Sequence, residues 1–194
     1  MSDTVNEALL SRLILAEKVA RAGGEKALEY FHHRDTLVVE TKHDLQDVVS
    51  RADREVEQMI DQQIRAQFAD DGFLGEEYGL QAGTSGYTWV VDPIDGTSPF
   101  LNGMPNWCVS VAVLHDGVPV IGVIYAPTYQ ECYVAALGQG ATLNGRRLQV
   151  DPARTLQNHV TGFGANSYVS PEEVGKILAS LLEAGGNFIR IGSG

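Results

Sequence analysis

The fold is decided by the stretch Trp89-Val90-Val91-Asp92-Pro93-Ile94-Asp95-Gly96-Thr97, in which an apolar strand runs directly into two carboxylates. The apolar run begins at residue 87 and stops abruptly at Asp92, which predicts a strand followed by a turn. Pro93 restricts its own φ and stiffens the chain between Asp92 and Asp95. Acids held on a stiff turn at a strand end are typical of a site that a sheet positions.

The residues of this turn suit a cation and a phosphate group. Hard divalent cations prefer carboxylate and carbonyl oxygens, and Asp92, the Ile94 carbonyl and Asp95 could supply three of them. Gly96 permits close backbone approach. Thr97 stands where a helix can begin, and free backbone N–H groups there suit an anion. The alternative is an Asp-Pro turn that only caps a helix; two acids, Pro, Gly and Thr in this order favour the functional interpretation.

Outward from this turn the apolar pattern predicts helices, then a meander of strands, then a helix and a strand. Residue Ser50, with Asp53 three positions on, indicates the start of the second helix. Asp116-Gly117 and Asn144-Gly145 are hairpin signals. The predicted helices are residues 5–31, a segment from 50 to about 68, and 171–184; the predicted strands are residues 36–41, 87–91, 109–114, 119–125, 130–136 and 187–191. The pattern indicates one layered α/β domain over residues 1–194 with a large sheet.

Composition excludes several classes of protein. The 194 residues carry 25 acids, 14 bases and a formal net charge of -11, so no basic nucleic-acid surface is indicated. No apolar run reaches the roughly 18 residues of a membrane span. Two cysteines, Cys108 and Cys132, cannot build a disulfide framework, and the N-terminus lacks the basic start of a signal peptide. We therefore expect a cytoplasmic protein that binds neither nucleic acid nor membrane.

The acids are concentrated near the turn, since 13 of the 25 lie between Glu40 and Asp95. A solvated surface is the simplest explanation of such a cluster. Gly75-Glu76-Glu77 follows a second short apolar segment, however, and would lie beside Asp92 if the two strands are neighbours. Two divalent cations about 3.5–4 Å apart are a known means of hydrolysing phosphate esters, and they need carboxylates from several elements. EF-hand, Walker and dinucleotide-binding spacings are absent, and the five histidines show no paired zinc spacing.

These residues resemble the magnesium-dependent, lithium-sensitive phosphatases of the inositol monophosphatase type. The resemblance covers essentially the whole chain and is most specific at residues 92–97. It implies an αβαβα sandwich of the inositol monophosphatase/fructose-bisphosphatase type and Mg²⁺ as the cofactor. The other matching segments are Lys42, residues 47–53, Gly75-Glu76-Glu77, residues 131–145 and Gly192-Ser193.

The resemblance also implies a role for each matching residue. Glu76, Asp92 and the Ile94 carbonyl would bind the first metal, and Asp92 with Asp95 the second. Thr97, hydrogen-bonded to Asp53, would orient and deprotonate the attacking water, with Glu77 in the outer shell or near a further, weaker ion. The substrate would be held by Asp95, Gly96, Thr97, Gly192 and Ser193.

Two features depart from the family pattern. Residues 98–100 are Ser-Pro-Phe where many members have Thr-Asn-Phe, and the chain ends before the Trp-Asp motif that completes the second metal site. We expect a domain incomplete at its C-terminal end that exposes apolar surface there. The preferred hypothesis is hydrolysis of an inositol monophosphate. The alternatives are another small substrate (a 3′-phosphoadenosine nucleotide, a sugar bisphosphate or histidinol phosphate) or a metal-binding module without catalysis; family members also form homodimers.

Overall fold

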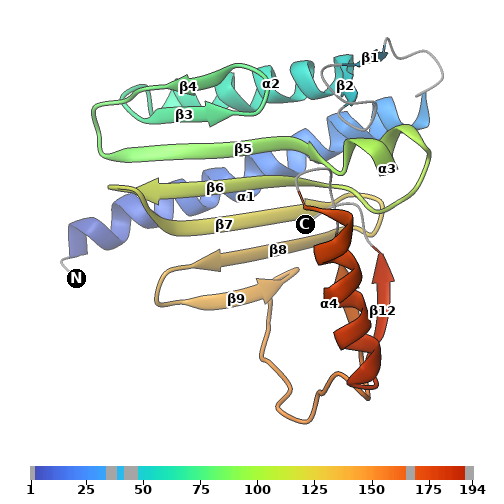
Figure 1. The fold of residues 1–194 in the computed structure, drawn as a ribbon. Coiled ribbons are helices and arrows are strands. Elements are labelled where there is room, and N and C mark those ends of the chain that lie inside the picture. Colours follow the sequence, from blue (N-terminus) through green and yellow to red (C-terminus); the bar gives the residue numbers. More distant parts are fainter. Residues whose placement is uncertain (1–2, 34–38, 42–47, 165–168, 191–194) are drawn as a thin grey trace.

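An eight-stranded mixed sheet forms the centre of the computed structural model, which describes residues 3–33, 39–41, 48–164 and 169–190 (Figure 1). The strands follow the order β10-β9-β8-β7-β6-β5-β3-β4. All neighbours are antiparallel except β3 and β5, which are parallel. The strands are β3 (Gly72–Gly75), β4 (Gly79–Gln81), β5 (Tyr87–Asp95), β6 (Cys108–His115), β7 (Val118–Ala126), β8 (Glu131–Ala136), β9 (Gly140–Leu143) and β10 (Arg146–Arg147).

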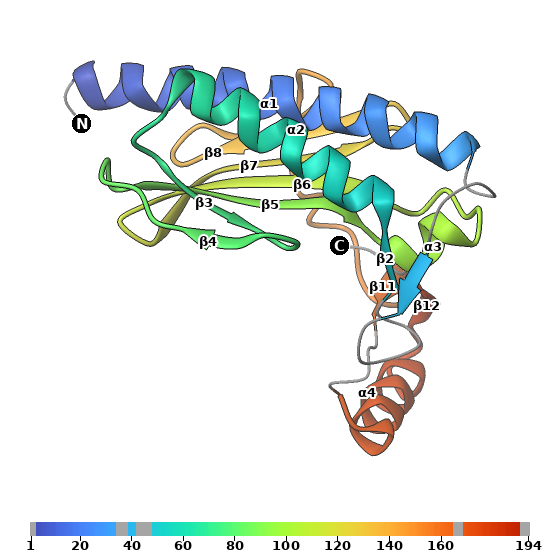
Figure 2. The same cartoon turned by 90° about the horizontal axis from the view of Figure 1, so that it is seen from above.

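Two helices, α1 (Asp3–His32) and α2 (Arg51–Gln67), lie side by side over one face of this sheet (Figure 2). The apolar stripe of α2 includes Val56, Ile60 and Ile64, all of which are buried. Because these residues recur at helical spacing, one face of α2 meets the sheet while its charged face meets solvent. The layered α/β fold expected from the sequence is therefore confirmed, as are the two helices. Short β1 (Val39–Thr41) and β2 (Val48–Ser50) pair antiparallel before α2.

The glycine pair in α1 does not interrupt the helix, which continues through Gly23 and Gly24. A Cβ atom on Gly24 would lie 2.3 Å from Cδ1 of Tyr125, and one on Gly23 would lie 2.9 Å from Cδ1 of Ile60. These distances are far below van der Waals contact, so the absence of side chains lets α1 approach both the sheet and α2. The glycines are packing positions rather than a bend.

Gly24→Ala is expected to destabilise the chain, whereas Gly175→Ala is expected to stabilise it. Tyr125 is buried and cannot yield to a new methyl group at Gly24, so overpacking costs about 1–3 kcal/mol. Gly175 is exposed inside a helix with open space around it, so alanine there gains up to about 1 kcal/mol of helix propensity. Urea unfolding of both variants checks the opposite signs; equal effects would contradict the packing explanation.

The meander follows the predicted turns. Asp116 and Gly117 have φ of 49° and 79°, and Asn144 and Gly145 have 48° and 79°, as a two-residue hairpin turn of type I′ requires. The strands predicted at residues 109–114, 119–125 and 130–136 are confirmed as β6, β7 and β8. Strands β4, β9 and β10 were not predicted, because segments of two to four residues carry no readable alternation.

A two-stranded sheet separate from the large one lies near the end of the described residues. Strands β11 (Val160–Phe163) and β12 (Asn187–Arg190) pair in parallel, with α4 (Pro171–Glu183) between them in the chain. Figure 1 shows α4 and β12 projecting away from the large sheet. Ser170 caps α4 in a capping box with Glu173, which confirms the predicted helix start. Five apolar side chains are 40–63% exposed in this region, namely Val160, Ile177, Leu182, Phe188 and Ile189.

Among the described residues, no helix is both long enough and apolar enough to cross a membrane.

Candidate active site

The acidic residues meet at one edge of the large sheet because β3 and β5 are parallel neighbours. Gly75, the last residue of β3, pairs with Val91. The residues that follow them, Glu76 just after β3 and Asp92 within β5, therefore lie beside each other. The expectation that these two strands are adjacent is confirmed, although 11 residues of the chain lie between the end of β3 and the start of β5.

The segment between the two aspartates is strand rather than turn, which corrects the sequence interpretation. Strand β5 continues to Asp95, and its pairing with β6 shifts register between Asp92 and Asp95. A bulge of this kind re-aims side chains at the end of a strand, and it accommodates Pro93, which cannot donate to the ladder. The backbone N–H of Ile94 donates to Oδ1 of Asp92 at 3.1 Å, which fixes the carboxylate over the bulge.

A left-handed glycine separates β5 from the short helix α3 (Thr97–Leu101). Gly96 has φ of 95° and precedes the first helical residue, with no side chain capping the helix. The Thr97 hydroxyl donates to the Ile94 carbonyl oxygen at 3.1 Å. Its single proton is thus directed to Ile94 here, and not to Asp53 as the family resemblance implied. The Ile94 carbonyl keeps a second lone pair available.

Four carboxylates influence one another at this edge. The pKa of Asp92 is raised to about 8, first because the group is buried and then because Glu76, Asp95 and Asp53 are negative neighbours and Glu76 is hydrogen-bonded to it. Burial and like charges both penalise the ionised form of a carboxyl group. Glu76 is exposed, whereas Asp53 is only 2% exposed. The cluster is therefore open to solvent on the Glu76 side and closed beneath by α2.

Two contacts near this cluster were not foreseen from the sequence. The buried thiol of Cys108 donates to Oδ2 of Asp95 at a sulfur–oxygen distance of 3.6 Å. Glu57, which is fully buried, accepts hydrogen bonds from the backbone of Glu77 and Tyr78. The sequence carried one signal for Glu57: it is a charged residue within the apolar stripe of α2, one turn after Asp53. A buried acid needs hydrogen-bond partners, so such a position indicates a polar contact in the interior.

The charge and chemistry of the cluster suit a hard divalent cation. Its oxygens come from carboxylates and one backbone carbonyl, the ligands that Mg²⁺ and Ca²⁺ prefer. A cation would also relieve the repulsion that raises the pKa of Asp92. Within the part of the chain that is described, no three Asp, Glu, His or Cys side chains are already arranged around a single metal position. In this conformation Asp92 and Glu76 are hydrogen-bonded to each other instead.

The remaining predicted residues are placed less fully. Glu77 is half-buried. The pKa of Glu57 is raised mainly by burial of Glu57 itself, and the negative charge of Glu77 raises it further. Lys42, Gly192 and Ser193 lie outside the described residues.

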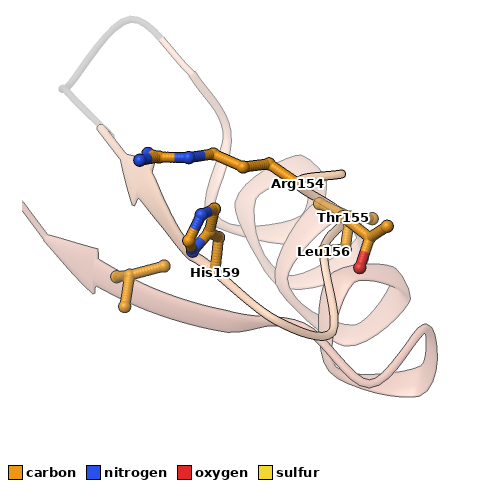
Figure 3. A pocket seen from close by; sticks show the side chains of 5 residues that line it. Arg154, Thr155, Leu156 and His159 are labelled. Carbon is orange, nitrogen blue, oxygen red and sulfur yellow. The ribbon is translucent and has the colours of Figure 1, made fainter. Parts of the chain in front are cut away.

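A hollow of about 650 Å³ lies elsewhere, lined by Arg154, Thr155, Leu156, His159 and Val160 (Figure 3). None of its lining residues belongs to the acidic cluster. The Arg154 side chain is 64% exposed and lies 3.8 Å from the carboxylate of Asp151. We therefore assign the chemistry to the acidic cluster rather than to this hollow.

Comparison with known proteins gives consistent matches. Residues 9–194 match the model described as the inositol monophosphatase family. A Nus factor SuhB of Xylella fastidiosa is 37% identical over 164 residues, which are 84% of this chain and 58% of that protein. A histidinol-phosphatase of Chlorobaculum parvum is 40% identical over 138 residues, 71% of this chain and 52% of that protein. The chain thus spans just over half the length of these relatives.

The fold matches solved structures of the same group. The crystal structure of the extragenic suppressor protein suhB from Bartonella henselae superposes with a TM-score of 0.87 at 31% identity. The match covers 94% of this chain and 71% of that one.

Proposed function

Because this chain belongs to the inositol monophosphatase family, we propose that it hydrolyses a small phosphate monoester with the help of Mg²⁺. The observation that carries the proposal is the convergence of Glu76, Asp95 and Asp53 on Asp92, which raises the pKa of that carboxyl group. Four carboxylates that repel one another at a strand edge are costly unless a cation neutralises them. In a metal-dependent phosphatase, the bound metal ion is that cation.

The proposed ligands are the side chains of Glu76, Asp92 and Asp95 and the carbonyl oxygen of Ile94. When bound, Mg²⁺ neutralises phosphate charge and lowers the pKa of a coordinated water. The bulge between Asp92 and Asp95 lets two acids from one strand face the same side. The Ile94 N–H donates to Asp92 and restricts the orientation of that one carboxylate, while Glu76 would have to exchange its hydrogen bond with Asp92 for a bond to the cation.

The remaining residues act on the water and the phosphate. Asp53 is a buried carboxylate at the base of the cluster, where it can accept the proton of the attacking water, while the Thr97 oxygen orients that water by accepting a hydrogen bond and Glu77 lies in the outer shell. The backbone of Gly96 and Thr97 starts α3 with no side chain in the capping position. These N–H groups would bind the phosphate oxygens, while Asp95, Gly192 and Ser193 would contact other parts of the substrate.

The proposed substrate is an inositol monophosphate, as the family description indicates. Histidinol phosphate is the first competitor, since a relative of 40% identity is named a histidinol-phosphatase. A sugar bisphosphate and a 3′-phosphoadenosine nucleotide share the same phosphate chemistry. Cys108 and Cys132 are buried thiols that form no disulfide, which suits the reducing cytoplasm.

The test is phosphate release from inositol 1-phosphate and the three competing substrates, each with Mg²⁺ and with a chelator. We expect Mg²⁺-dependent turnover that is fastest with inositol 1-phosphate and is inhibited by Li⁺. Faster turnover of histidinol phosphate would reassign the substrate. Cation binding without turnover of any substrate would instead support a metal-binding module that lacks catalysis, and absence of both would overturn the proposal.

A further inference from the structure

A buried glutamate links α2 to the turn that carries Glu76. Glu57 has no exposed surface and lies one helical turn after Asp53, so both side chains project from the same side of α2. Asp53 reaches the acidic cluster, whereas Glu57 reaches the backbone just after Glu76. One rigid helix therefore contacts both sides of the cluster.

The contact is a pair of backbone hydrogen bonds. Oε2 of Glu57 accepts from the N–H of Glu77 at 2.9 Å, and Oε1 accepts from the N–H of Tyr78 at 3.1 Å. Hydrogen bonds between a carboxylate and N–H groups are among the stronger ones in proteins. Because the two donors are consecutive, a single side chain fixes the orientation of the peptide units that follow Glu76.

The fit at this contact is tight. A Cβ atom on Gly75 would lie 2.0 Å from Oε1 of Glu57 and 2.3 Å from its Cδ. Only glycine at the end of β3 allows the carboxylate to approach the turn so closely. The Glu76 side chain is exposed, so burial does not hold it near Asp92. The two hydrogen bonds from the Glu77 and Tyr78 N–H groups to Glu57 instead hold the backbone that carries it.

We propose that Glu57 is a positioning residue for metal binding, which holds the turn after β3 so that Glu76 faces Asp92. This inference rests on the proposed function. It assigns Glu57 no contact with metal or substrate; its effect is transmitted through the backbone of Glu77 and Tyr78. Partners that orient a ligand in this way typically change metal affinity by about 10–100-fold when they are replaced.

Direct titration of the 194-residue chain with Mn²⁺, followed by electron paramagnetic resonance of the free ion, tests the proposal. Glu57→Gln keeps one acceptor oxygen but turns an amide NH₂ toward the second N–H donor. We expect Mn²⁺ to bind this variant about 10–100-fold more weakly than wild type. In assays of hydrolysis, the Mg²⁺ concentration for half-maximal rate should rise while the rate at saturating Mg²⁺ changes much less.

Two further variants separate position from charge. Glu57→Asp keeps the charge but shortens the side chain by one methylene, so it should also weaken Mn²⁺ binding. Asp61→Asn removes the same charge one turn farther along α2, where Asp61 pairs with Arg65, and should leave Mn²⁺ affinity within about twofold. Wild-type affinity in Glu57→Asp, or an equal loss in Asp61→Asn, would overturn the positioning role.

A measurement on the wild type covers the case in which the Glu57 variants do not fold. Hydrogen exchange in the metal-free chain should be slow at the Glu77 and Tyr78 amides. Fast exchange at both would contradict the hydrogen bonds to Glu57 and overturn the positioning role. Failure of the wild type to bind Mn²⁺ at all would contradict the proposed function instead, so the two failures are distinguishable.

Discussion

Asp92→Asn is expected to abolish Mg²⁺-dependent phosphate release while leaving the metal-free protein at least as stable as wild type at pH 7. Asp92 is the proposed ligand shared by both cations. Loss of a shared ligand removes several kcal/mol of charge stabilisation from the transition state, and each 1.36 kcal/mol corresponds to about tenfold in rate. We expect a decrease in rate of at least about 1,000-fold.

The retained stability follows from the charge state of Asp92 in the folded and the unfolded chain, because at pH 7 ionisation of Asp92 stabilises only the unfolded wild type. Because the pKa of Asp92 is raised to about 8, the carboxyl group is mostly protonated at pH 7 without metal. Asparagine is then a close neutral substitute in size and charge. Loss of the fold in Asp92→Asn would indicate that the cluster is structural rather than catalytic.

The same pKa shift predicts how stability depends on pH. The folded chain holds a proton on Asp92 up to about pH 8, whereas the unfolded chain releases it near 3.8. The stability of the metal-free protein therefore falls as pH rises between these values. Urea unfolding at pH 5 and pH 8 without metal checks this: wild type should lose more stability over the interval than Asp92→Asn. Equal pH dependence would contradict the assignment of the proton to Asp92.

Asp71→Ala is expected to cost about 3–5 kcal/mol of unfolding free energy, the usual effect of removing one partner of a buried ion pair. Arg12 of α1 donates to both carboxylate oxygens of Asp71, at 2.7 and 2.8 Å. Its guanidinium also lies over the rings of Phe68 and Tyr87, at 4.3 and 3.7 Å. Removing the carboxylate leaves that buried charge without its counterion.

Asp71 has further donors that would lose their acceptor. Ser85 Oγ lies 2.6 Å from it and Trp89 Nε1 2.8 Å. Burial alone would raise the pKa of Asp71, but the hydrogen bonds from Arg12, Ser85 and Trp89 outweigh it and lower the pKa below 3.8. The stabilisation is therefore complete above pH 3.8 and is lost as pH falls through the folded pKa.

Urea unfolding at pH 7 measures the effect of Asp71→Ala. Asp151→Ala is the matched control, because Asp151 is an exposed acid only 3.8 Å from Arg154 and such pairs contribute about 0–1 kcal/mol. The double variant Arg12→Met with Asp71→Leu should cost less than Asp71→Ala, since no buried charge remains unpaired. A cost below about 1 kcal/mol for Asp71→Ala would contradict the importance of the network.

The sequence predicted those features that local residues determine. The helices appear where apolar residues recur at helical spacing, and Asp116-Gly117 forms the hairpin because both residues adopt positive φ. The adjacency of Glu76 and Asp92 was a conditional prediction, since only the parallel pairing of β3 and β5 brings the two strand ends together.

Features that depend on distant partners could not be predicted. Residues 92–95 remain in the strand because β6 pairs with them across a bulge, although Pro93 alone indicated a turn. The burial of Glu57 and Arg12 depends on N–H groups and carboxylates more than 15 residues away in the chain. The Thr97 hydroxyl donates to the Ile94 carbonyl, a choice of acceptor that the residue types alone do not determine.

The position of α2 has a consequence for how the molecule opens. One end of the helix contacts the acidic edge through Asp53 and Glu57, and just beyond the other end Phe68 and Asp71 are held by Arg12. A segment fastened at both ends cannot detach alone, so α2 should unfold in one cooperative step with the sheet beneath it. Any ion that settles at the acidic edge would thereby strengthen the whole layer, including parts it never touches.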